Sequence, residues 1–269
     1  MEKIKQAIEK ARQQGGQKAE LQRPVAVSPA TTSEVGEFSY RQTRVVRLNP
    51  RHLEKNRIVA MNKSNLSSLS FDLLRTKVLQ KMEEQGWRTL AIASPVAECG
   101  KTVVALNLAI AIAHHSNKTA MLVDFDLRKP KVAEYLGLPD GPSLNEVLEG
   151  NADVSEAFVN PGMPRLVVLP VARPIRKSAE MLDSTRVNQL IGDLRERYKE
   201  RIVIFDLPPI LNTDDAIVVL PKIDCVLVVV ANGMCTKKEI EDCLHHIPEA
   251  KLVGTVLNKA EGEPRSDYY

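Results

Sequence analysis

The feature that most constrains the fold is an apolar stretch that turns sharply into a helix-like run. Residues 90–107 read LAIASPVAECGKTVVALN, and Gly100, Lys101 and Thr102 end the short turn. This layout is typical of a phosphate-binding loop, where N–H groups at the start of a helix and the helix dipole face phosphate oxygens. Lys101 would reach the β- and γ-phosphates, and the Thr102 hydroxyl would face Mg²⁺. The segment therefore predicts a nucleoside triphosphate as ligand.

The loop departs from the usual pattern G-x-x-x-x-G-K-[ST] at two positions. Pro95 stands where the pattern has its first glycine, and Glu98 places a carboxylate inside the loop. Glutamate restricts the backbone more than glycine does, and its side chain would repel phosphate if it turned inward. Taken alone, the segment is also compatible with an ordinary strand–turn–helix junction.

Acidic residues at the ends of two later apolar strands favour the nucleotide interpretation. Residues 119–130 (TAMLVDFDLRKP) contain Asp124 and Asp126, whose side chains project to the same side. Residues 201–209 (RIVIFDLPP) place Asp206 before two prolines. In a parallel sheet flanked by helices, strand ends gather at one edge, where ligands bind. These carboxylates and the Lys-Thr loop predict a Mg²⁺–nucleotide site; the alternative is that the aspartates only mark turns.

Strands and helices alternate from about residue 65 onward. We expect helices over 66–82, 101–115, 143–149, 184–198 and 236–246, and strands over 88–93, 119–124, 165–169, 201–206, 224–231 and 251–257. This alternation predicts an α/β fold with a mostly parallel sheet and helices on both faces, and the loop at Gly100-Lys101-Thr102 makes it one of the P-loop NTPase type. With 269 residues, 43% of them hydrophobic, the chain is long enough to bury one large core of this kind.

The chain divides into four predicted segments. Residues 1–16 predict a short amphipathic helix, because their apolar positions have helical spacing and two glycines follow. Residues 17–57 predict a flexible basic linker, residues 58–262 the nucleotide-binding P-loop domain, and residues 263–269 a tyrosine-bearing tail. The basic residues of the linker indicate a solvated charged segment, with contact to anionic lipid or an acidic partner as the alternative.

The cysteines and the apolar runs indicate a cytoplasmic protein. Cys99, Cys225, Cys235 and Cys243 show no metal-type spacing, so we expect reduced thiols. Cys99 is the one placed where oxidation could block nucleotide. No apolar run approaches the roughly 18 to 20 residues that span a bilayer, and the N-terminus lacks a signal-peptide core.

Three motifs in this order resemble those of the bacterial tyrosine autokinases of polysaccharide biosynthesis and export. They are Ser94 with the Gly-Lys-Thr turn, LVDFDLRKP at 122–130 and IFDLPP at 204–209. The resemblance covers roughly residues 58–260, and D-x-D-L-R-x-P is its most discriminating part. That family shares a P-loop scaffold with the MinD/ParA partitioning ATPases. Those ATPases carry an extra lysine early in the loop, and Val96 at this position favours the kinase branch.

The chain also departs from the family pattern. Ala97 and Glu98 replace the proline and glycine that are usual in the loop. The family's E-x-x-R-x-x-R segment, used in ring assembly, falls on Leu69, Asp72 and Arg75, so only its last position is kept. The tail holds two tyrosines, fewer than is usual.

The resemblance implies an ATP-dependent, non-specific protein-tyrosine autokinase acting in exopolysaccharide or capsule biosynthesis and export. Asp124 would orient or deprotonate the tyrosine hydroxyl, Thr102 and Asp126 would hold Mg²⁺, and Asp206 would support the water shell of the metal. The implied catalytic residues are Lys101, Asp124, Asp126 and Asp206. The implied ATP-binding residues are Ala97, Glu98, Cys99, Gly100, Lys101, Thr102, Val103 and Asn258. The implied phosphate acceptors are Tyr268 and Tyr269 of a neighbouring subunit.

The resemblance also implies partners. We expect a separate membrane adaptor of the polysaccharide co-polymerase type, a homo-oligomer, and a position at the inner face of the membrane through that adaptor. We expect no transmembrane segment in the chain itself and no nucleic acid partner. Two other functions stay open. Pro95 and Glu98 favour a degenerate nucleotide-binding regulatory adaptor, whereas Val96 and the tail tyrosines oppose a MinD/ParA-like switch ATPase.

Overall fold

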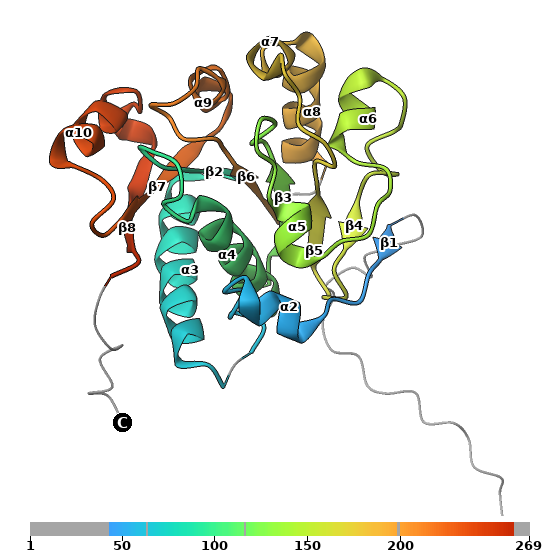
Figure 1. Cartoon of the computed structure of the whole chain (residues 1–269), viewed down its shortest axis with the longest axis horizontal. Helices are drawn as coiled ribbons and strands as arrows, with labels where there is room; N and C mark the ends of the chain where they lie inside the picture. The colour runs from blue at the N-terminus through green and yellow to red at the C-terminus, as the bar shows by residue number, and fades with distance from the viewer. Residues whose placement is uncertain (1–42, 63, 116, 198–199, 261–269) are drawn as a thin grey trace, which may run out of the picture. The chain divides into compact units, whose positions relative to one another are not determined.

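The computed structural model describes residues 43–62, 64–115, 117–197 and 200–260 (Figure 1). In this part of the chain an eight-stranded sheet has the order β1-β4-β5-β3-β6-β2-β7-β8. Every pairing is parallel except that of β4 with β5. The strands are β1 (Arg44–Val45), β2 (Thr89–Ala93), β3 (Thr119–Asp124), β4 (Val159–Asn160), β5 (Leu166–Leu169), β6 (Arg201–Asp206), β7 (Cys225–Ala231) and β8 (Leu252–Asn258).

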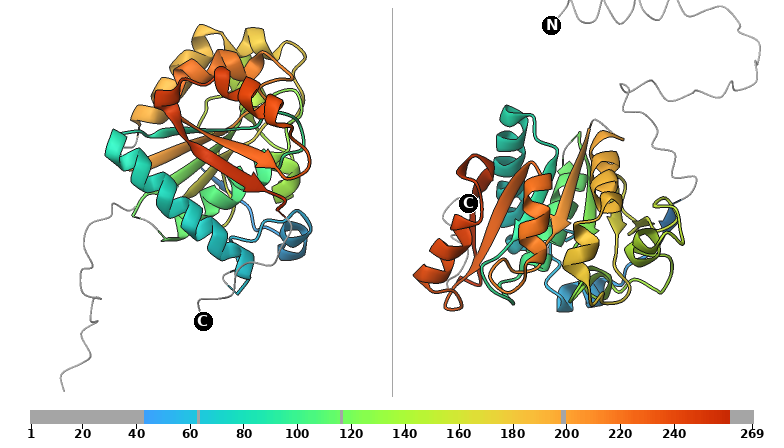
Figure 2. Two further views of the ribbon diagram at one scale, coloured as in Figure 1. Left: turned by 90° about the vertical axis from the view of Figure 1, so that its left-hand side faces the viewer. Right: turned by 90° about the horizontal axis from the view of Figure 1, so that it is seen from above.

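Helices cover both faces of the sheet, as the alternating pattern predicts (Figure 2). One face carries α2 (Pro50–Lys55), α3 (Leu66–Gln85), α4 (Lys101–His115) and α5 (Val132–Leu136). The other carries α6 (Leu144–Glu149), α7 (Ser178–Leu182), α8 (Thr185–Glu196), α9 (Asp215–Val219) and α10 (Lys237–His245). Short 3₁₀ turns follow at η1 (Leu220–Lys222) and η2 (Glu249–Lys251). The predicted fold class is confirmed.

Burial on both faces explains the composition of the central strands. Every residue of β2, β3, β6 and β7 is buried, and these strands are almost continuously apolar. A parallel sheet covered by helices requires this pattern, because no strand face meets water. The aspartates at the ends of β3 and β6 are therefore exceptions that need a separate explanation.

The structure differs from the sequence prediction in residues 44–57. This stretch was expected to belong to a flexible linker, but it contains β1 and α2. The Asn49 side chain caps α2 by accepting from the backbone N–H groups of Arg51 at 3.0 Å and His52 at 3.5 Å, and Pro50 occupies the first turn. The helix is too short and too charged to show an apolar period, so a pattern search passes over it.

Several other short elements also lack a prediction, including β4, α5, α7 and α9. The predicted N-terminal helix (1–16), the first part of the linker (17–42) and the tail with its two tyrosines lie outside the described residues. Within the described part, none of the helices combines the length and the apolar character needed to cross a bilayer.

Candidate functional site

The register of the sheet brings the predicted acidic residues together. Asp124 at the end of β3 pairs directly with Asp206 at the end of β6, and Asp206 also pairs with Ile92 of β2. The three strands are parallel neighbours, so the loops that follow them leave the same edge. The phosphate-binding loop predicted after β2 therefore lies beside both aspartate segments, as expected for a ligand site in an open α/β sheet.

The loop before α4 has a tightly defined backbone. Glu98 and Gly100 both have positive φ, at 61° and 90°. A Cβ atom on Gly100 would collide with Nδ2 of Asn258, so glycine is required there. That same Nδ2 donates to the Cys99 carbonyl at 2.8 Å. Asn258, predicted to contact the nucleotide base, thus holds the loop in shape from the end of β8.

The start of α4 joins the loop to Asp206. The Thr102 hydroxyl donates to Oδ2 of Asp206 at 2.6 Å, while Oδ1 of Asp206 is buried and has no hydrogen-bond partner among the described residues. Lys101 is only 7% exposed. Its positive charge acts on Asp126 and Asp206, where it opposes the effect of burial on the pKa of each carboxyl.

Asp124 and Asp206 are buried side by side, where their ionised forms are unfavourable. Burial raises the pKa of Asp206 to about 6, although Lys101 and the Thr102 hydroxyl act against the rise. Burial, and next the neighbouring Asp206, raise the pKa of Asp124 well above its ordinary value. Two buried carboxylates side by side repel each other unless a proton or a cation lies between them. The arrangement is therefore suited to a bound cation.

Asp124 and Asp126 have different surroundings despite their spacing of two residues. Both carboxylate oxygens of Asp124 accept backbone N–H groups, from Asp126 at 3.2 Å and Val132 at 3.1 Å, and the side chain is fully buried. Asp126 accepts from the Lys129 N–H at 3.0 Å and lines a cavity. Asp124 thus shapes the segment after β3, and Asp126 is the carboxylate that faces the ligand space.

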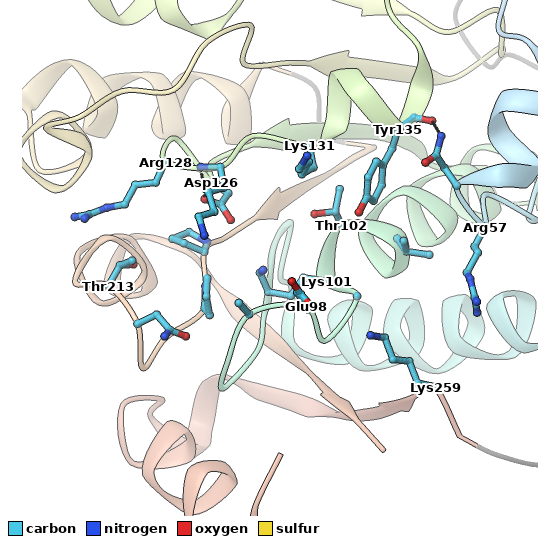
Figure 3. A pocket seen from close by; sticks show the side chains of 18 of the residues that line it. Arg57, Glu98, Lys101, Thr102, Asp126, Arg128, Lys131, Tyr135, Thr213 and Lys259 are labelled. Atoms are coloured by element: carbon cyan, nitrogen blue, oxygen red, sulfur yellow. Dashed lines mark hydrogen bonds between the residues drawn. The ribbon is translucent and has the colours of Figure 1, made fainter. Parts of the chain in front are cut away.

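A cavity of about 740 Å³ lies over these strand ends (Figure 3). Predicted site residues in its lining are Ala97, Glu98, Gly100, Lys101, Thr102, Val103 and Asp126. Predicted site residues outside its lining are Cys99, Asp124, Asp206 and Asn258. The structure thus brings the loop and the aspartates into one site. The predicted residues outside the lining lie behind the surface that a ligand would contact.

The cavity is strongly basic. Seven lysine and arginine side chains line it, against two acidic ones, Glu98 and Asp126. Figure 3 shows basic side chains on both sides of Lys101, with Arg128 on one side and Arg57 and Lys259 on the other. Such an excess of positive charge suits a polyphosphate, and the volume of the cavity is that of a small-molecule site.

Sequence reasoning missed more than half of the lining. The missed residues are Lys55, Asn56, Arg57, Arg128, Lys129, Lys131, Tyr135, Pro208, Pro209, Asn212, Thr213 and Lys259. The first three belong to the segment expected to be a linker. Its run of basic residues was visible in the sequence, but nothing in the local pattern placed it against the loop.

A buried asparagine explains how that segment reaches the cavity. Asn107 of α4 is fully buried, and its Oδ1 accepts from the N–H groups of Val59 at 2.8 Å and Ala60 at 2.9 Å. Its Nδ2 donates to the carbonyl of Arg57 at 3.0 Å. The asparagine stands alone among apolar residues of α4, and this was the sequence signal that could have indicated a partner segment.

The arginine of the D-x-D-L-R segment connects the site to the opposite face of the sheet. The Arg128 guanidinium donates from Nη2 to Asp215 at 2.8 Å and to Asp214 at 3.2 Å, and from Nε to the Ser178 hydroxyl at 2.9 Å. Asp215 is fully buried, so it needs this cation. The contact fixes the segment after β3 against α7 and α9.

Oxygen ligands for a hard cation are present around Asp206. They are the Thr102 hydroxyl, the unpartnered Asp206 oxygen and the Asp126 carboxylate at the cavity. The described residues contain no group of three His, Cys, Asp or Glu side chains that could hold a metal alone. Mg²⁺ usually binds through one or two carboxylates together with substrate phosphates, so this set fits it.

Comparison with known proteins gives relatives that include tyrosine-protein kinases and a polysaccharide transport protein. No family model matches the chain. The tyrosine-protein kinase ptk of Acinetobacter johnsonii is 26% identical over 75% of this chain, which spans 27% of that protein. The tyrosine-protein kinase YwqD of Bacillus subtilis is 27% identical over 80% of this chain and 91% of its own length. The succinoglycan biosynthesis transport protein ExoP of Rhizobium meliloti is 30% identical over 65% of this chain and 22% of its own length. The chain thus spans less than a third of the length of the first and third of these relatives.

Solved structures show the same fold. The chimerical protein CapA2B2 superposes with a TM-score of 0.71 at 24% identity, covering 81% of this chain and 94% of its own. The septum site-determining protein MinD of Pyrococcus horikoshii, solved with Mg-ADP, has a TM-score of 0.52 at 21% identity, covering 65% of this chain and 72% of its own. At these identities the likeness concerns the fold alone, and it confirms the predicted P-loop scaffold shared with MinD-like ATPases.

Proposed function

We propose that this chain, a homologue of bacterial tyrosine-protein kinases, is itself an ATP-dependent protein-tyrosine autokinase acting in exopolysaccharide or capsule biosynthesis and export. The observation that carries the proposal is the contact between Thr102 and Asp206 beneath a basic cavity that also holds Lys101 and Asp126. Phosphoryl transfer depends mainly on positioning and on charge stabilisation. Both requirements are supported by this arrangement.

ATP would lie with its phosphates on the loop from Ala97 to Val103, at the start of α4. Lys101 would neutralise charge on the γ-phosphoryl group. Mg²⁺ would be held by Thr102 and by the unpartnered oxygen of Asp206, directly or through water, which leaves Asp126, expected from the sequence to be a metal ligand, available for another role. The bound cation would supply charge neutralisation between the phosphates and the carboxylates. It would also offset the repulsion between Asp124 and Asp206.

The transfer itself breaks the bond between the γ-phosphorus and its bridging oxygen and forms a bond from the tyrosine oxygen to that phosphorus. The proton of the tyrosine hydroxyl must leave toward a base. The sequence prediction gave this role to Asp124. We assign it to Asp126, because this carboxylate lines the cavity while both oxygens of Asp124 are held by backbone N–H groups. Asp124 would then be a positioning residue.

The acceptor and the partners rest on homology. Tyr268 and Tyr269 of a neighbouring subunit are the proposed acceptors, and both lie outside the described residues. A separate membrane adaptor of the polysaccharide co-polymerase type, a homo-oligomer and a location at the inner face of the membrane complete the proposal. The names of the relatives, which include a succinoglycan biosynthesis transport protein, support this context.

The test is the intact mass of the purified protein before and after incubation with Mg·ATP. Lys101→Met and the Tyr268→Phe/Tyr269→Phe double variant are measured beside it. We expect phosphate additions in the unmodified protein that vanish in both variants. The absence of any addition, even with the cytoplasmic tail of the candidate adaptor present, would refute the kinase proposal.

One observation favours a second function. Glu98 lines the cavity, and its carboxylate would repel phosphate. A regulatory adaptor that binds nucleotide weakly would tolerate this charge. An ATP titration on the same sample separates this case from the kinase, and release of inorganic phosphate without phosphotyrosine would instead indicate a switch ATPase.

A further inference from the structure

A cysteine of the phosphate-binding loop meets a second cysteine from the loop after β7. The Cys99 and Cys235 sulfur atoms lie 3.4 Å apart, although the residues are separated by 136 positions in the sequence. Cys99 is fully buried, and Cys235 is partly exposed at the loop between β7 and α10. We propose that this thiol pair is an oxidative modification site, at which a peroxide forms a reversible Cys99–Cys235 disulfide that closes the nucleotide site. The second part of this proposal rests on the proposed nucleotide function.

Both cysteines are held in place by neighbouring hydrogen bonds. The carbonyl of Cys99 accepts from Nδ2 of Asn258 at 2.8 Å. The loop that carries Cys235 is fixed on one side because the Asn232 N–H donates to the Asn258 carbonyl at 2.9 Å. On the other side, Thr236 forms a capping box with Glu239 at the start of α10. The sulfur atoms are therefore kept near each other without a covalent bond.

The chemistry balances with peroxide as the oxidant. The Cys235 sulfur, which is the accessible one, attacks a peroxide oxygen, the O–O bond breaks, and a sulfenic acid and one water form. The Cys99 sulfur then attacks the Cys235 sulfur, the S–S bond forms, and the hydroxide that leaves takes the Cys99 proton as a second water. A dithiol reductant reverses the step by thiol–disulfide exchange and is itself oxidised to a disulfide.

The disulfide would displace the loop. A sulfur–sulfur bond is about 2.05 Å long, so the two atoms must approach each other by about 1.4 Å from their present 3.4 Å. Cys99 precedes Gly100 and Lys101, and Gly100 already packs against Asn258 without room for a Cβ. Misplacement of catalytic groups by about 1 Å is enough to reduce function by about 100-fold. We therefore expect oxidation to weaken ATP binding at least tenfold.

The other two cysteines provide controls. Cys243 on α10 is fully buried, and its pKa is raised to about 12 by burial first and by the nearby Cys235 and Cys99 next. Cys225 is fully buried in β7 and donates to the Thr89 carbonyl at 3.4 Å. A Cys243→Ala variant should keep the disulfide. Cys235→Ala removes it at a residue outside the cavity lining, so the reduced variant should bind ATP as the unmodified protein does.

The experiment treats the full chain with hydrogen peroxide, blocks free thiols, and maps the cross-link by mass spectrometry of peptides without reduction. ATP affinity is measured calorimetrically before oxidation, after it, and after reduction with dithiothreitol. We expect a Cys99–Cys235 peptide, an affinity loss of at least tenfold that dithiothreitol reverses, and no loss in Cys235→Ala. A cross-link between other cysteines, or an unchanged affinity in the cross-linked protein, would overturn the proposal.

The same experiment separates this proposal from the proposed function. If the reduced protein binds no ATP, the proposed function fails. The thiol pair is then judged by the cross-link and by hydrogen exchange of residues 97–103, which should slow on oxidation. Unaltered exchange in the cross-linked protein would reject the effect on the loop. If Cys235→Ala does not fold, Cys235→Ser is used in its place.

Discussion

Replacing Glu98 with glycine should stabilise the fold and tighten the binding of Mg·ATP, for two separate reasons. The first is backbone strain, because Glu98 has a φ of 61°. A residue with a Cβ is less stable by about 1 to 2 kcal/mol in this left-handed backbone conformation. Glycine avoids that cost, but it makes the unfolded chain more flexible, which lowers the free energy of unfolding by about 0.5 to 1 kcal/mol. The free energy of unfolding should therefore rise by about 0.5 to 1 kcal/mol, or about 1 to 4 °C in Tm for a domain of this size.

The second reason is charge. The Glu98 side chain is exposed and lines the cavity where the phosphates are proposed to bind. Two like charges about 4 Å apart in water repel by about 1 kcal/mol, which is roughly a fivefold change in Kd. Glu98→Gln removes only the charge, and Glu98→Ala removes the charge but keeps the strained Cβ. All three variants should bind ATP more tightly, whereas only Glu98→Gly should be more stable.

Urea denaturation and calorimetric ATP titration separate the two effects. The strain argument is refuted if Glu98→Gly is no more stable than Glu98→Ala. The charge argument is refuted if Glu98→Gln binds ATP no better than the unmodified protein. If ATP affinity improves only in the glycine variant, loop geometry rather than charge limits binding.

Three further predictions follow from buried polar groups. Burial raises the pKa of Asp206 to about 6 from 3.8, so the ligand-free fold is less stable above that pKa by about 3 kcal/mol and gains stability as the pH falls from 7 to 4. Asp206→Asn should remove the part of this dependence that Asp206 contributes and leave the part from Asp124, whose pKa burial also raises. It should raise the midpoint of urea denaturation at pH 8 in EDTA while abolishing the proposed autophosphorylation; an unchanged midpoint would contradict it. Asn107→Ala removes the acceptor of the Val59 and Ala60 N–H groups and the donor to the Arg57 carbonyl, so it should destabilise the fold by about 2 to 4 kcal/mol and speed hydrogen exchange of residues 50–60. Arg128→Lys keeps the charge but loses the forked contact with the buried Asp215, so urea denaturation should show a loss of about 1 to 3 kcal/mol. A double-mutant cycle with Asp215→Asn should show strong coupling, and additive effects would argue against the contact.

The sequence was sufficient for the central part of the fold. The strands that end at Asp124 and Asp206 and the helix that begins at Lys101 are found with the predicted bounds, because long apolar runs and a Gly-Lys-Thr turn have few alternative structures. The same motifs correctly placed the loop beside the aspartates, since parallel strands must end at one edge.

The remaining parts of the site depend on contacts between distant segments. Residues 55–57 line the cavity because Asn107, about 50 positions further along the chain, holds the backbone of residues 57–60, and no local pattern encodes that contact. Asn258 supports the loop through the Cys99 carbonyl. The two residues are 159 positions apart in the sequence, so a local motif cannot predict this contact either. Asp124 is buried whereas Asp126 lines the cavity, and this difference depends on the turn that brings the Val132 N–H to the Asp124 carboxylate.

The position of Asn107 on α4 has a mechanical consequence. The helix carries the phosphate-binding loop at its first residue and, within two turns, the asparagine that fixes residues 57–60. The helix is therefore connected at its start to the phosphate-binding loop and a short way along to the segment between α2 and α3. A displacement of that segment would move the helix and shift the phosphate-binding loop without any contact to nucleotide. By reciprocity, a bound nucleotide would restrain the segment between α2 and α3, so the mobility of that segment should report whether the site is filled.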